Sequence, residues 1–547
     1  MRPLPLLTPD NEFFWTSGAD GLLRFRRCAV CRSYQHPMGP ICRTCGSADL
    51  APEAVSGHGV VVGFTINEHS WSPDFTPPYV IAIVAIDEDA RVRLTTNLVD
   101  IPHDEVFVGQ RVSVVFEHVE DVWIPNFTAR TDLTEPGPIP EDEPIAPHVR
   151  PMIGADKDKF EHKVALTGIG MSKISRHSGV DPLSLTIDAC RQAVADAGLS
   201  MSDIDGLSTY PGGPASSGFS EGGVPALEES LRVRPTWFNG SMETPGQGGS
   251  VVNAMLAVAA GLCRHVLCFR TVWESSANDR RRAQPPASVR LEGDFATWRH
   301  VFGAMSAANW IGMNASNHFH KYGTTRDALA AVALNARRNA ALNPAAIYRE
   351  PLTIDDYYAA RMITTPFGLY DCDVPVDGSV AVVVSAKDAA RDGPRPPILV
   401  ESVGTQIVER LSWDQGTLSH EPQTQGPAAH LWSRSSLTQA DVDLAELYDG
   451  FTFNCLSWIE ALGFCGIGEI GDYLADPDRI SLGGELPLNT FGGQLSAGRT
   501  HGYGYIHEAV VQLRGDAGAR QVANAEVAVV STGGGTPGGC FLFTTDR

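Results

Sequence analysis

The strongest constraint on the fold of this chain is a sequence pattern that occurs twice in its second part. The stretch LSMSDIDGLST at 199–209 is echoed by LTQADVDLAEL at 437–447, each with a leucine, a hydroxyl residue and an Asp-β-branched-Asp step. An apolar, strand-like stretch precedes each echo, at 164–170 and at 398–404. The offsets of the two pairs are 238 and 234 residues, so the pattern predicts two halves of similar layout.

Strands alternate with helices in this part of the chain. The stretch 164–171 has strand character, and Asp181 followed by Pro182 is a typical helix start. Gly198 ends that helix, and its apolar residues recur at helical spacing: Leu183, Ile187, Cys190, Val194 and Ala197. The alternation predicts an α/β fold with a largely parallel sheet covered by helices.

A proline-rich acidic stretch separates this part from the N-terminal one. Its prolines exclude a regular helix or a central strand, so we expect an extended linker at 135–160. Before it, four short strand-like runs with no helical pattern between them predict a small β-barrel at 51–134: 59–66, 79–86, 92–99 and 110–119.

The segment 1–50, where we expect a helix and a zinc ribbon, contains four cysteines with the spacing of a metal site. Cys28, Cys31, Cys42 and Cys45 form C-x2-C-x10-C-x2-C, which lets four soft thiolates surround one ion. We expect one structural Zn²⁺, because a closed shell of four sulfurs leaves no position for substrate. A redox dithiol and four unrelated thiols are the alternatives.

The charge of the chain argues against nucleic-acid binding, although arginines surround these cysteines. A formal net charge of −22 repels phosphate backbones and anionic membranes. We expect a solvated or interface-facing arginine face rather than a phosphate clamp: Arg24, Arg26, Arg27, Arg32 and Arg43. With no signal-peptide pattern, only short apolar runs and no disulfide-like framework, the sequence predicts a cytoplasmic protein.

Both parts of the chain resemble known families. FFWTSGADGLLRFRRCAVCRSYQHPMGPICRTCGS and GVVVGFTINEHS are similar to the zinc-ribbon/OB-fold domain that accompanies thiolase-like enzymes. From residue 163 the chain resembles the sterol-carrier-protein branch of the thiolases, through YDGFTFNCLSWIEALGFCGIGE, NTFGGQLSAGRTHGYGYIHEAVVQLRG and STGGGTPGG. The resemblance implies a duplicated thiolase-like αβαβα fold, with an N-terminal half and loop insertion at 161–396 and a C-terminal half at 397–547.

The residues that thiolase chemistry requires are absent from the matching positions. The nucleophilic cysteine of the family corresponds to about Gly246, at the start of the small-residue helix PGQGGSVVNAMLAVAAGL. Tyr448-Asp449 replaces a histidine–aspartate pair, Gly498-Arg499-Thr500 replaces glycine–histidine–proline, and Ser531 replaces the C-terminal cysteine. A glycine cannot be acylated, so we do not expect ordinary thiolase activity. The remaining cysteines fall at core-like positions: Cys263, Cys268, Cys455 and Cys540.

What remains resembles the steroid side-chain aldolases, which are thiolase homologues that lack the cysteines and rely on two tyrosines in these motifs. The resemblance implies retro-aldol cleavage of a β-hydroxyacyl-CoA to a ketone and a short acyl-CoA, such as propionyl-CoA or acetyl-CoA. We assign Tyr448 as proton or oxyanion donor and Tyr503 as base, roles that could be exchanged. Tyr505, two residues further on, is the alternative to Tyr503.

Further candidate site residues flank these tyrosines. Asp449 is expected to orient backbone, and His501 belongs either to the site or to the core. Ser531 and the glycine run Gly533, Gly534 and Gly535 are candidate oxyanion or CoA contacts, or simply a tight loop.

Two other functions and two partners complete the expectations. The chain could be an acyltransferase or Claisen enzyme with an atypical nucleophile, or a non-catalytic acyl-CoA or sterol scaffold. The resemblance implies a homodimer through the thiolase-like domain and a hotdog-fold enoyl-CoA hydratase as partner, with coenzyme A present as part of the substrate.

Overall fold

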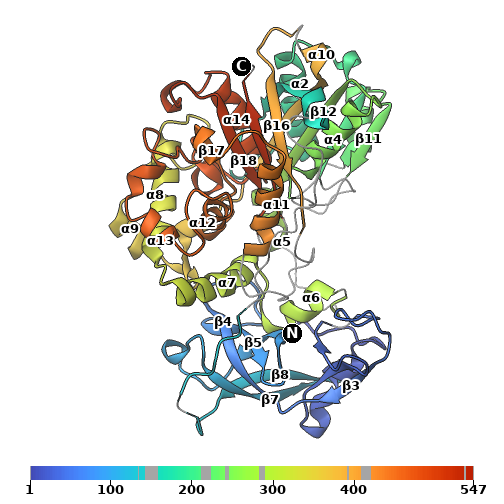
Figure 1. The fold of residues 1–547 in the computed structure, drawn as a ribbon, viewed down its shortest axis with the longest axis vertical. Helices are drawn as coiled ribbons and strands as arrows, with labels where there is room; N and C mark the ends of the chain where they lie inside the picture. Colours follow the sequence, from blue (N-terminus) through green and yellow to red (C-terminus); the bar gives the residue numbers. More distant parts are fainter. Residues whose placement is uncertain are drawn as a thin grey trace.

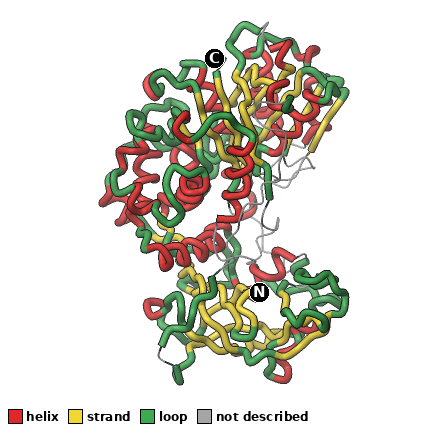
Figure 2. Tube along the Cα trace, viewed as in Figure 1, coloured by secondary structure: helices red, strands yellow, loops and turns green. Residues whose placement is uncertain are grey.

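The computed structural model has two parts, a nine-stranded α/β body and a smaller β domain below it (Figure 1). It describes residues 2–37, 39–133, 135–141, 158–210, 223–240, 246–282, 290–292, 294–390, 393–407, 421–534 and 538–545. Most of the predicted linker therefore lies outside the described residues. Helices cover the strands of the body, and the small domain consists mainly of strands and loops (Figure 2).

The sheet of the body repeats one order of strands in its two halves. Counted outward from the centre, the first half runs β9, β15, β12, β10, β11 and the second runs β16, β19, β18, β17. The corresponding pairs have the same direction, antiparallel next to the centre and parallel further out. This order confirms the predicted duplication. The strands are β9 (Val164–Met171), β10 (Gly206–Thr209), β11 (Trp237–Gly240), β12 (His265–Trp273), β15 (Asp377–Ala386), β16 (Ile398–Gly404), β17 (Leu444–Glu446), β18 (Val527–Thr532) and β19 (Gly539–Thr544).

The prediction of a largely parallel sheet was wrong, because most strand pairs of the body are antiparallel. Two strands cause the difference. β19 follows β18 after only a short connection, and β15 enters the sheet from a long insertion, so neither completes a parallel βαβ crossover.

The sequence echo has the same local structure in both halves. Ser200 and Thr438 each cap a short 3-10 turn, with a backbone N–H that donates to the carboxylate three residues later at 2.8 Å. The second aspartate of each step, Asp205 or Asp443, accepts backbone N–H groups at the start of β12 or β18. The repeated aspartates therefore join the start of one strand to the start of its neighbour.

Alternate residues of the sheet face different helix layers. Leu267 and Phe269 of β12 pack with α2 and α3, whereas Val266 and Cys268 point into the main core with α4, α12 and α14. Asp181 caps α2 through the N–H of Ser184, as predicted. The helices are α2 (Pro182–Asp196), α3 (Gly223–Leu231), α4 (Gly249–Ala259), α10 (Lys387–Ala390), α11 (Glu421–Ser433), α12 (Thr452–Ala461), α13 (Ile470–Tyr473) and α14 (Tyr503–Leu513).

The small domain is a closed five-stranded barrel with a zinc-ribbon-like sheet beside it. β4 pairs with both β5 and β7, which closes the order β4, β5, β6, β8, β7. The four predicted strands are present, and β8 was missed. The barrel contains β4 (His58–Asn67), β5 (Tyr79–Ile86), β6 (Asp89–Leu98), β7 (Arg111–Val119) and β8 (Val122–Ala129); α1 (Glu12–Trp15) precedes the ribbon strands β1 (Arg24–Cys28), β2 (Tyr34–Gln35) and β3 (Leu50–Ala54).

An insertion between β12 and β15 binds the barrel to the body. Its strand β13 pairs with β4 of the barrel, so the barrel sheet continues into the insertion. Helix α7 lies across β4 at close range, because the Cα of Gly63 carries no side chain: a Cβ there would lie 2.5 Å from the carbonyl oxygen of Met313. The insertion contains α5 (Glu274–Arg282), α6 (Asp294–Arg299), α7 (Ala307–Tyr322), α8 (Arg326–Ala341), α9 (Ile354–Ala359), β13 (Met362–Thr364) and β14 (Phe367–Gly368).

Aromatic packing forms a second contact between the insertion and the N-terminal domain. Trp298 of α6 stacks on Trp15 of α1, with ring centroids 5.1 Å apart, and also meets Phe14 edge-on. Phe302 joins the same buried cluster. The core of the small domain is therefore completed by residues of the body, and the two domains pack as one unit.

Among the described residues, none of the helices is both long and apolar enough to cross a membrane.

We predict that Gly63→Ala destabilises the junction between barrel and body. The new methyl group would overlap the α7 backbone, which cannot move without breaking its own hydrogen bonds, and overpacking of this kind costs about 1–3 kcal/mol. Thermal and urea unfolding would measure the loss. Gly483→Ala is the matched control because a Cβ there meets no atom within 4 Å; equal stability of the two variants would contradict the prediction.

Candidate active site and metal centre

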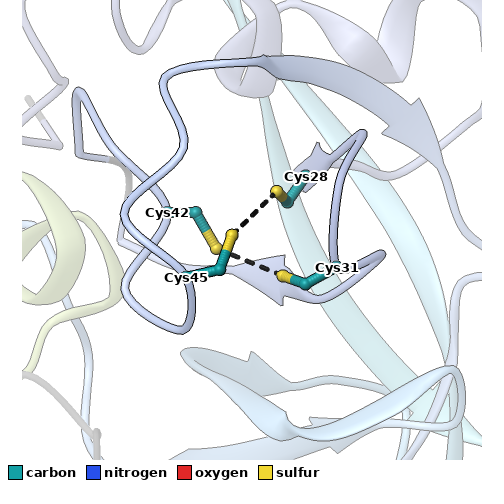
Figure 3. A group of neighbouring side chains, drawn as sticks. All are labelled: Cys28, Cys31, Cys42 and Cys45. Atoms are coloured by element: carbon teal, nitrogen blue, oxygen red, sulfur yellow. Dashed lines mark hydrogen bonds between the residues drawn. The ribbon is translucent and has the colours of Figure 1, made fainter.

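The four N-terminal cysteines converge on one point. Their sulfur atoms all lie within 4.8 Å of one another, with Cys28 Sγ 3.6 Å from Cys45 Sγ and Cys31 Sγ 3.5 Å from Cys42 Sγ (Figure 3). Four thiolates around a tetrahedral ion with metal–sulfur bonds of about 2.3 Å lie roughly 3.8 Å apart. The group therefore has the donor set and the dimensions to hold one metal ion.

The arginines around this cluster interact mainly with acidic side chains of the same domain. Arg24 binds Asp20, Arg26 binds Asp10, and both Arg27 and Arg32 approach Glu53, while Arg43 donates to the carbonyl of His36. These pairs favour the solvated-face interpretation over a phosphate clamp.

The candidate catalytic residues lie on elements that pack together where two helices begin and two strands end. Helix α4 begins beside the loop at Gly246, and α14 begins at Tyr503. The N-termini of the two helices are joined by a hydrogen bond of 2.6 Å between Ser250 Oγ and Tyr503 Oη. Strand β17 leads to Tyr448, and β18 ends at Thr532 beside the Gly246 loop.

Gly246, the position that we matched approximately to the thiolase nucleophile from the sequence, has no room for any side chain. Its backbone is left-handed, with φ +61°, and a Cβ would lie 2.2 Å from the carbonyl oxygen of Thr532. The same loop is fixed by the Gly248 N–H, which donates to Thr532 Oγ1 at 3.1 Å. The glycine at this position thus goes with a local packing in which Thr532, at the end of β18, lies where a side chain at position 246 would begin.

Tyr448 and Ser531 are joined by a hydrogen bond from the backbone of Tyr448 to the side chain of Ser531. The N–H of Tyr448 donates to Ser531 Oγ at 2.9 Å, and Ser531 is buried in β18 opposite Cys540. Ser531 therefore stabilises the end of β17 through this hydrogen bond. The contact gives no sign that the serine hydroxyl is activated as a nucleophile. Tyr448 itself is 6% exposed.

Asp449 is the centre of a buried hydrogen-bond network. Its carboxylate accepts from Tyr505 Oη, from Asn489 Nδ2 at 2.9 Å and from the N–H of Gln494 at 2.7 Å. Burial raises the pKa of Asp449 to about 6, although these donors oppose the rise. Gly493 is required beside it, since a Cβ there would overlap the carboxylate. Asp449 therefore orders the strand end and the loop before α14.

The two tyrosines of the HGYGY motif form hydrogen bonds with different partners, so each stabilises a different part of the site. Tyr505 binds Asp449 through its hydroxyl, whereas Tyr503 binds Ser250. Both side chains are fully buried, and burial raises the pKa of each phenol well above its usual value. Tyr503 is thus a protonated phenol in the neutral pH range.

His501 and Arg499 lie in the loop before α14. The N–H of His501 donates to Gln494 Oε1 at 3.0 Å, and its Nδ1 lies 3.4 Å from Arg270 Nη2. Arg499 instead binds two acids: its Nη1 donates to the Glu274 carboxylate at 3.0 Å, and its Nε lies 3.1 Å from Asp373 Oδ2. Burial raises the pKa of Asp373 to about 7.

The glycine run after β18 is partly described. Gly533 has φ +90° and its carbonyl accepts from Trp458 Nε1 at 2.8 Å, and a Cβ on Gly534 would overlap Asn454. Gly535 lies outside the described residues. Several polar residues that fix the site were not predicted from the sequence: Ser250, Arg270, Glu274, Asp373, Asn489 and Gln494. Only Arg270 has a sequence signal, a charge within the apolar strand HVLCFRTVW.

Two sequence families match the chain. Residues 418–539 match the family described as "Thiolase C-terminal domain-like", and residues 52–117 match "ChsH2, C-terminal OB-fold domain".

Individual proteins match each part. A "Steroid side-chain-cleaving aldolase" of Thermomonospora curvata is 34% identical over 392 residues, covering 70% of this chain and 98% of the relative. The "17-hydroxy-3-oxo-4-pregnene-20-carboxyl-CoA lyase" of Mycobacterium tuberculosis is 34% identical over 391 residues, covering 69% of this chain and 97% of that relative. A "Probable enoyl-CoA hydratase alpha subunit" of T. curvata is 38% identical over 112 residues, covering 20% and 34%.

A solved structure agrees in fold as well as in sequence. The "Ltp2-ChsH2(DUF35) aldolase" superimposes with a TM-score of 0.63 at 31% identity, covering 72% of this chain and 99% of that chain.

We predict that Gly246→Ala lowers the stability of the body by about 2–4 kcal/mol, because a methyl group would overlap the β18 backbone in addition to the cost of a left-handed alanine. Gly261→Ala separates the two effects, since Gly261 has φ +76° but a Cβ there meets no atom within 4 Å. Urea unfolding of both variants would measure the difference, and a Gly246→Ala loss no greater than that of Gly261→Ala would contradict it.

Proposed function

Because the chain belongs to the family of thiolase-like steroid side-chain-cleaving aldolases, we propose that it is a carbon–carbon lyase that cleaves a steroid-type β-hydroxyacyl-CoA by a retro-aldol reaction. The observation that carries this proposal is the packing at Gly246, which excludes a cysteine nucleophile and with it the acyl-enzyme of a thiolase. The family assignment disfavours the acyltransferase and scaffold alternatives.

The name of one relative defines a suitable substrate. A 17-hydroxy-pregnene-20-carboxyl-CoA carries its hydroxyl on the carbon β to the thioester. Removal of the hydroxyl proton turns the C–O bond into a ketone and breaks the Cα–Cβ bond, and the electron pair moves onto the thioester as an enolate. Protonation at Cα then releases propionyl-CoA, so no outside reactant is needed. A substrate without the α-methyl branch releases acetyl-CoA.

The environment of the tyrosines supports one division of their roles. Tyr503 is buried and keeps its proton, which suits a hydrogen-bond or proton donor to the developing enolate. Tyr448 is then the group that accepts the β-hydroxyl proton, for which it reacts as the phenolate, and this proton balances the one delivered to Cα. These two roles are the reverse of those assigned from the sequence, which left the exchange between Tyr448 and Tyr503 open. Asp449 holds the Gln494 segment and the Tyr505 side chain in place, through the Gln494 N–H and the Tyr505 hydroxyl, rather than taking a proton itself.

We further propose that the backbone around Ser531, Gly533 and Gly534 contacts the thioester and pantetheine of the substrate. The left-handed Gly533 lies beside the Gly246 loop, because a Cβ on it would stand 3.1 Å from Gly246 Cα. The absence of side chains at Gly533 and Gly534 therefore lets the backbone approach this loop closely.

The metal of the four-cysteine cluster is proposed to be zinc. Cys28, Cys31, Cys42 and Cys45 supply four thiolates at tetrahedral spacing, and such sites prefer zinc among the common divalent ions. The ion would cross-link a ribbon with little core of its own and would take no part in the chemistry.

Two partners are proposed. A second copy of the chain is expected at the edge strand β11, where Phe238 is 66% exposed at the end of the nine-stranded sheet. A hotdog-fold enoyl-CoA hydratase is a suitable partner for the N-terminal domain, because a hydratase subunit matches part of this chain and hydration of an enoyl thioester produces a β-hydroxyacyl-CoA.

We predict that Tyr448→Phe and Tyr503→Phe each lower kcat for retro-aldol cleavage by about 10²–10⁴-fold without unfolding the protein. Loss of one hydroxyl removes either the proton acceptor or the enolate donor. A tertiary β-hydroxyacyl-CoA of the steroid side-chain type would be the substrate, with release of ketone and propionyl-CoA measured by chromatography. Tyr473→Phe is the control, because this ring packs on Arg479 away from the site. Undiminished turnover in both variants would defeat the assignment.

We predict one zinc ion per chain by elemental mass spectrometry of the purified protein. Replacement of Cys28 and Cys31 by serine should remove the ion and lower the unfolding temperature of the N-terminal domain, because two of four ligands are lost. Cys465→Ser should keep the full zinc content. A metal-free wild-type protein with the same unfolding temperature as the zinc-bound form would show that the cluster is not a structural zinc site.

A further inference from the structure

A buried arginine from the first half of the body reaches the histidine of the second half. Arg270 lies on β12 and is only 1% exposed, and its Nη1 donates to the Thr271 carbonyl at 2.5 Å. Its Nη2 lies 3.4 Å from Nδ1 of His501, which stands 231 residues further along the chain. Burying a guanidinium is costly, so its position at this site calls for a function.

The contact fixes which nitrogen of His501 carries a proton. A guanidinium has only donors, so Nδ1 of the imidazole must accept. The proton of the neutral ring is then on Nε2, which makes that atom a hydrogen-bond donor.

The charges around His501 favour the neutral ring. Burial, together with the positive charges of Arg499 and Arg270, lowers the pKa of His501 well below its usual value. The ring of Tyr210, which follows β10, stacks nearly parallel to the imidazole, with ring centroids 6.3 Å apart. The centroid of the Tyr210 ring lies 5.1 Å from Arg270 Cζ. The acids near Arg499, Glu274 and Asp373, bind its guanidinium.

The backbone conformation of His501 also restricts the position of its side chain. His501 is a non-glycine residue in the left-handed region, with φ +53°, an uncommon conformation that clusters at functional sites. The next residue, Gly502, packs against the Gly246 loop: a Cβ there would lie 2.9 Å from Gln247 Cβ. The ring is therefore held next to the loop where the thioester is proposed to bind.

We propose that Arg270 is a positioning residue that holds His501 in its Nε2–H form, so that the imidazole donates a hydrogen bond to the thioester oxygen as the enolate forms. This inference rests on the proposed retro-aldol function for its chemical meaning, but the state of the ring can be measured without any substrate. In this arrangement Arg270 need not touch the substrate, and the second oxyanion donor, beside Tyr503, is a neutral ring.

The first experiment measures the tautomer of His501 by heteronuclear NMR of the full chain labelled with ¹⁵N at its histidine rings. The His501 signal is assigned by its absence in His501→Gln. We expect the Nε2–H form, unchanged between pH 5.5 and 8, in the wild type and in Arg270→Lys, which keeps a cationic donor. In Arg270→Met we expect a mixture of tautomers and a titration that moves toward the ordinary histidine pKa of about 6.5.

Arg93→Met is the control, because it removes a buried arginine from β6 of the barrel and should leave the His501 signal unchanged. A wild-type ring with its proton on Nδ1, or one that titrates normally, would overturn the proposal. If Arg270→Met does not fold, the wild type and Arg270→Lys still decide it.

The second experiment follows kcat for cleavage against pH. Loss of a preorganised oxyanion donor should lower kcat of Arg270→Met by about 10–100-fold at pH 8, with little change in KM. The ratio of variant to wild-type kcat should rise as the pH falls, because the protonated imidazole of the variant again donates from Nε2. A ratio that does not change with pH would refute the link to His501, whereas absence of wild-type turnover would refute the proposed function and leave the NMR result standing.

Discussion

The site depends on one close contact, the approach of the Gly246 loop to the end of β18. The carbonyl of Thr532 lies where a side chain at position 246 would begin, and the Thr532 hydroxyl accepts from the Gly248 N–H. This contact joins the first helix of the site, α4, to the last strands of the second half. The two halves therefore meet here through the Thr532 carbonyl and hydroxyl, and the position matched to the thiolase cysteine contributes no functional group.

The second constraint is the way the barrel is attached. Strand β13, helix α7 and the Trp298 segment all belong to one insertion in the body, and each contacts a different part of the N-terminal domain. Polar contacts add to this packing, with Asn309 Nδ2 donating to Asn67 Oδ1 and Asn317 Nδ2 donating to the Val62 carbonyl. An attachment made of sheet pairing, helix packing and an aromatic cluster does not depend on the linker, whose central residues the structure does not describe.

The sequence predicted the features that depend on local pattern. The echo at 199–209 and 437–447 led to the duplication, and alternation and turn residues located four barrel strands to within three residues. Prediction from the sequence failed where contacts between distant residues determine the strands and their directions. β8 contains Pro125 and Asn126, which interrupt the strand pattern, and β13 has only three residues and forms by pairing with the barrel. The parallel sheet was predicted from βα alternation, but β15 arrives from the insertion and runs antiparallel to its neighbours. Likewise, the motifs indicated Tyr448, Tyr503 and His501. Ser250 is distant in sequence and gave no signal, and Arg270 gave only a charge within an apolar strand.

The polar groups of the site share one physical property, which is that burial disfavours their charged forms. Burial raises the pKa of the Tyr503 and Tyr505 phenols and of the Asp449 carboxyl, and it lowers that of the His501 imidazole. Each shift favours the neutral form of its group. A site of this kind does not favour an ionised nucleophile on the enzyme, such as the thiolate of a thiolase. It is well suited to donating hydrogen bonds to an oxyanion that forms on the substrate, because neutral donors in a buried site need little reorganisation when the charge appears. The missing cysteines remove thiolase chemistry from this site, and its buried neutral donors provide the conditions for cleavage through an enolate.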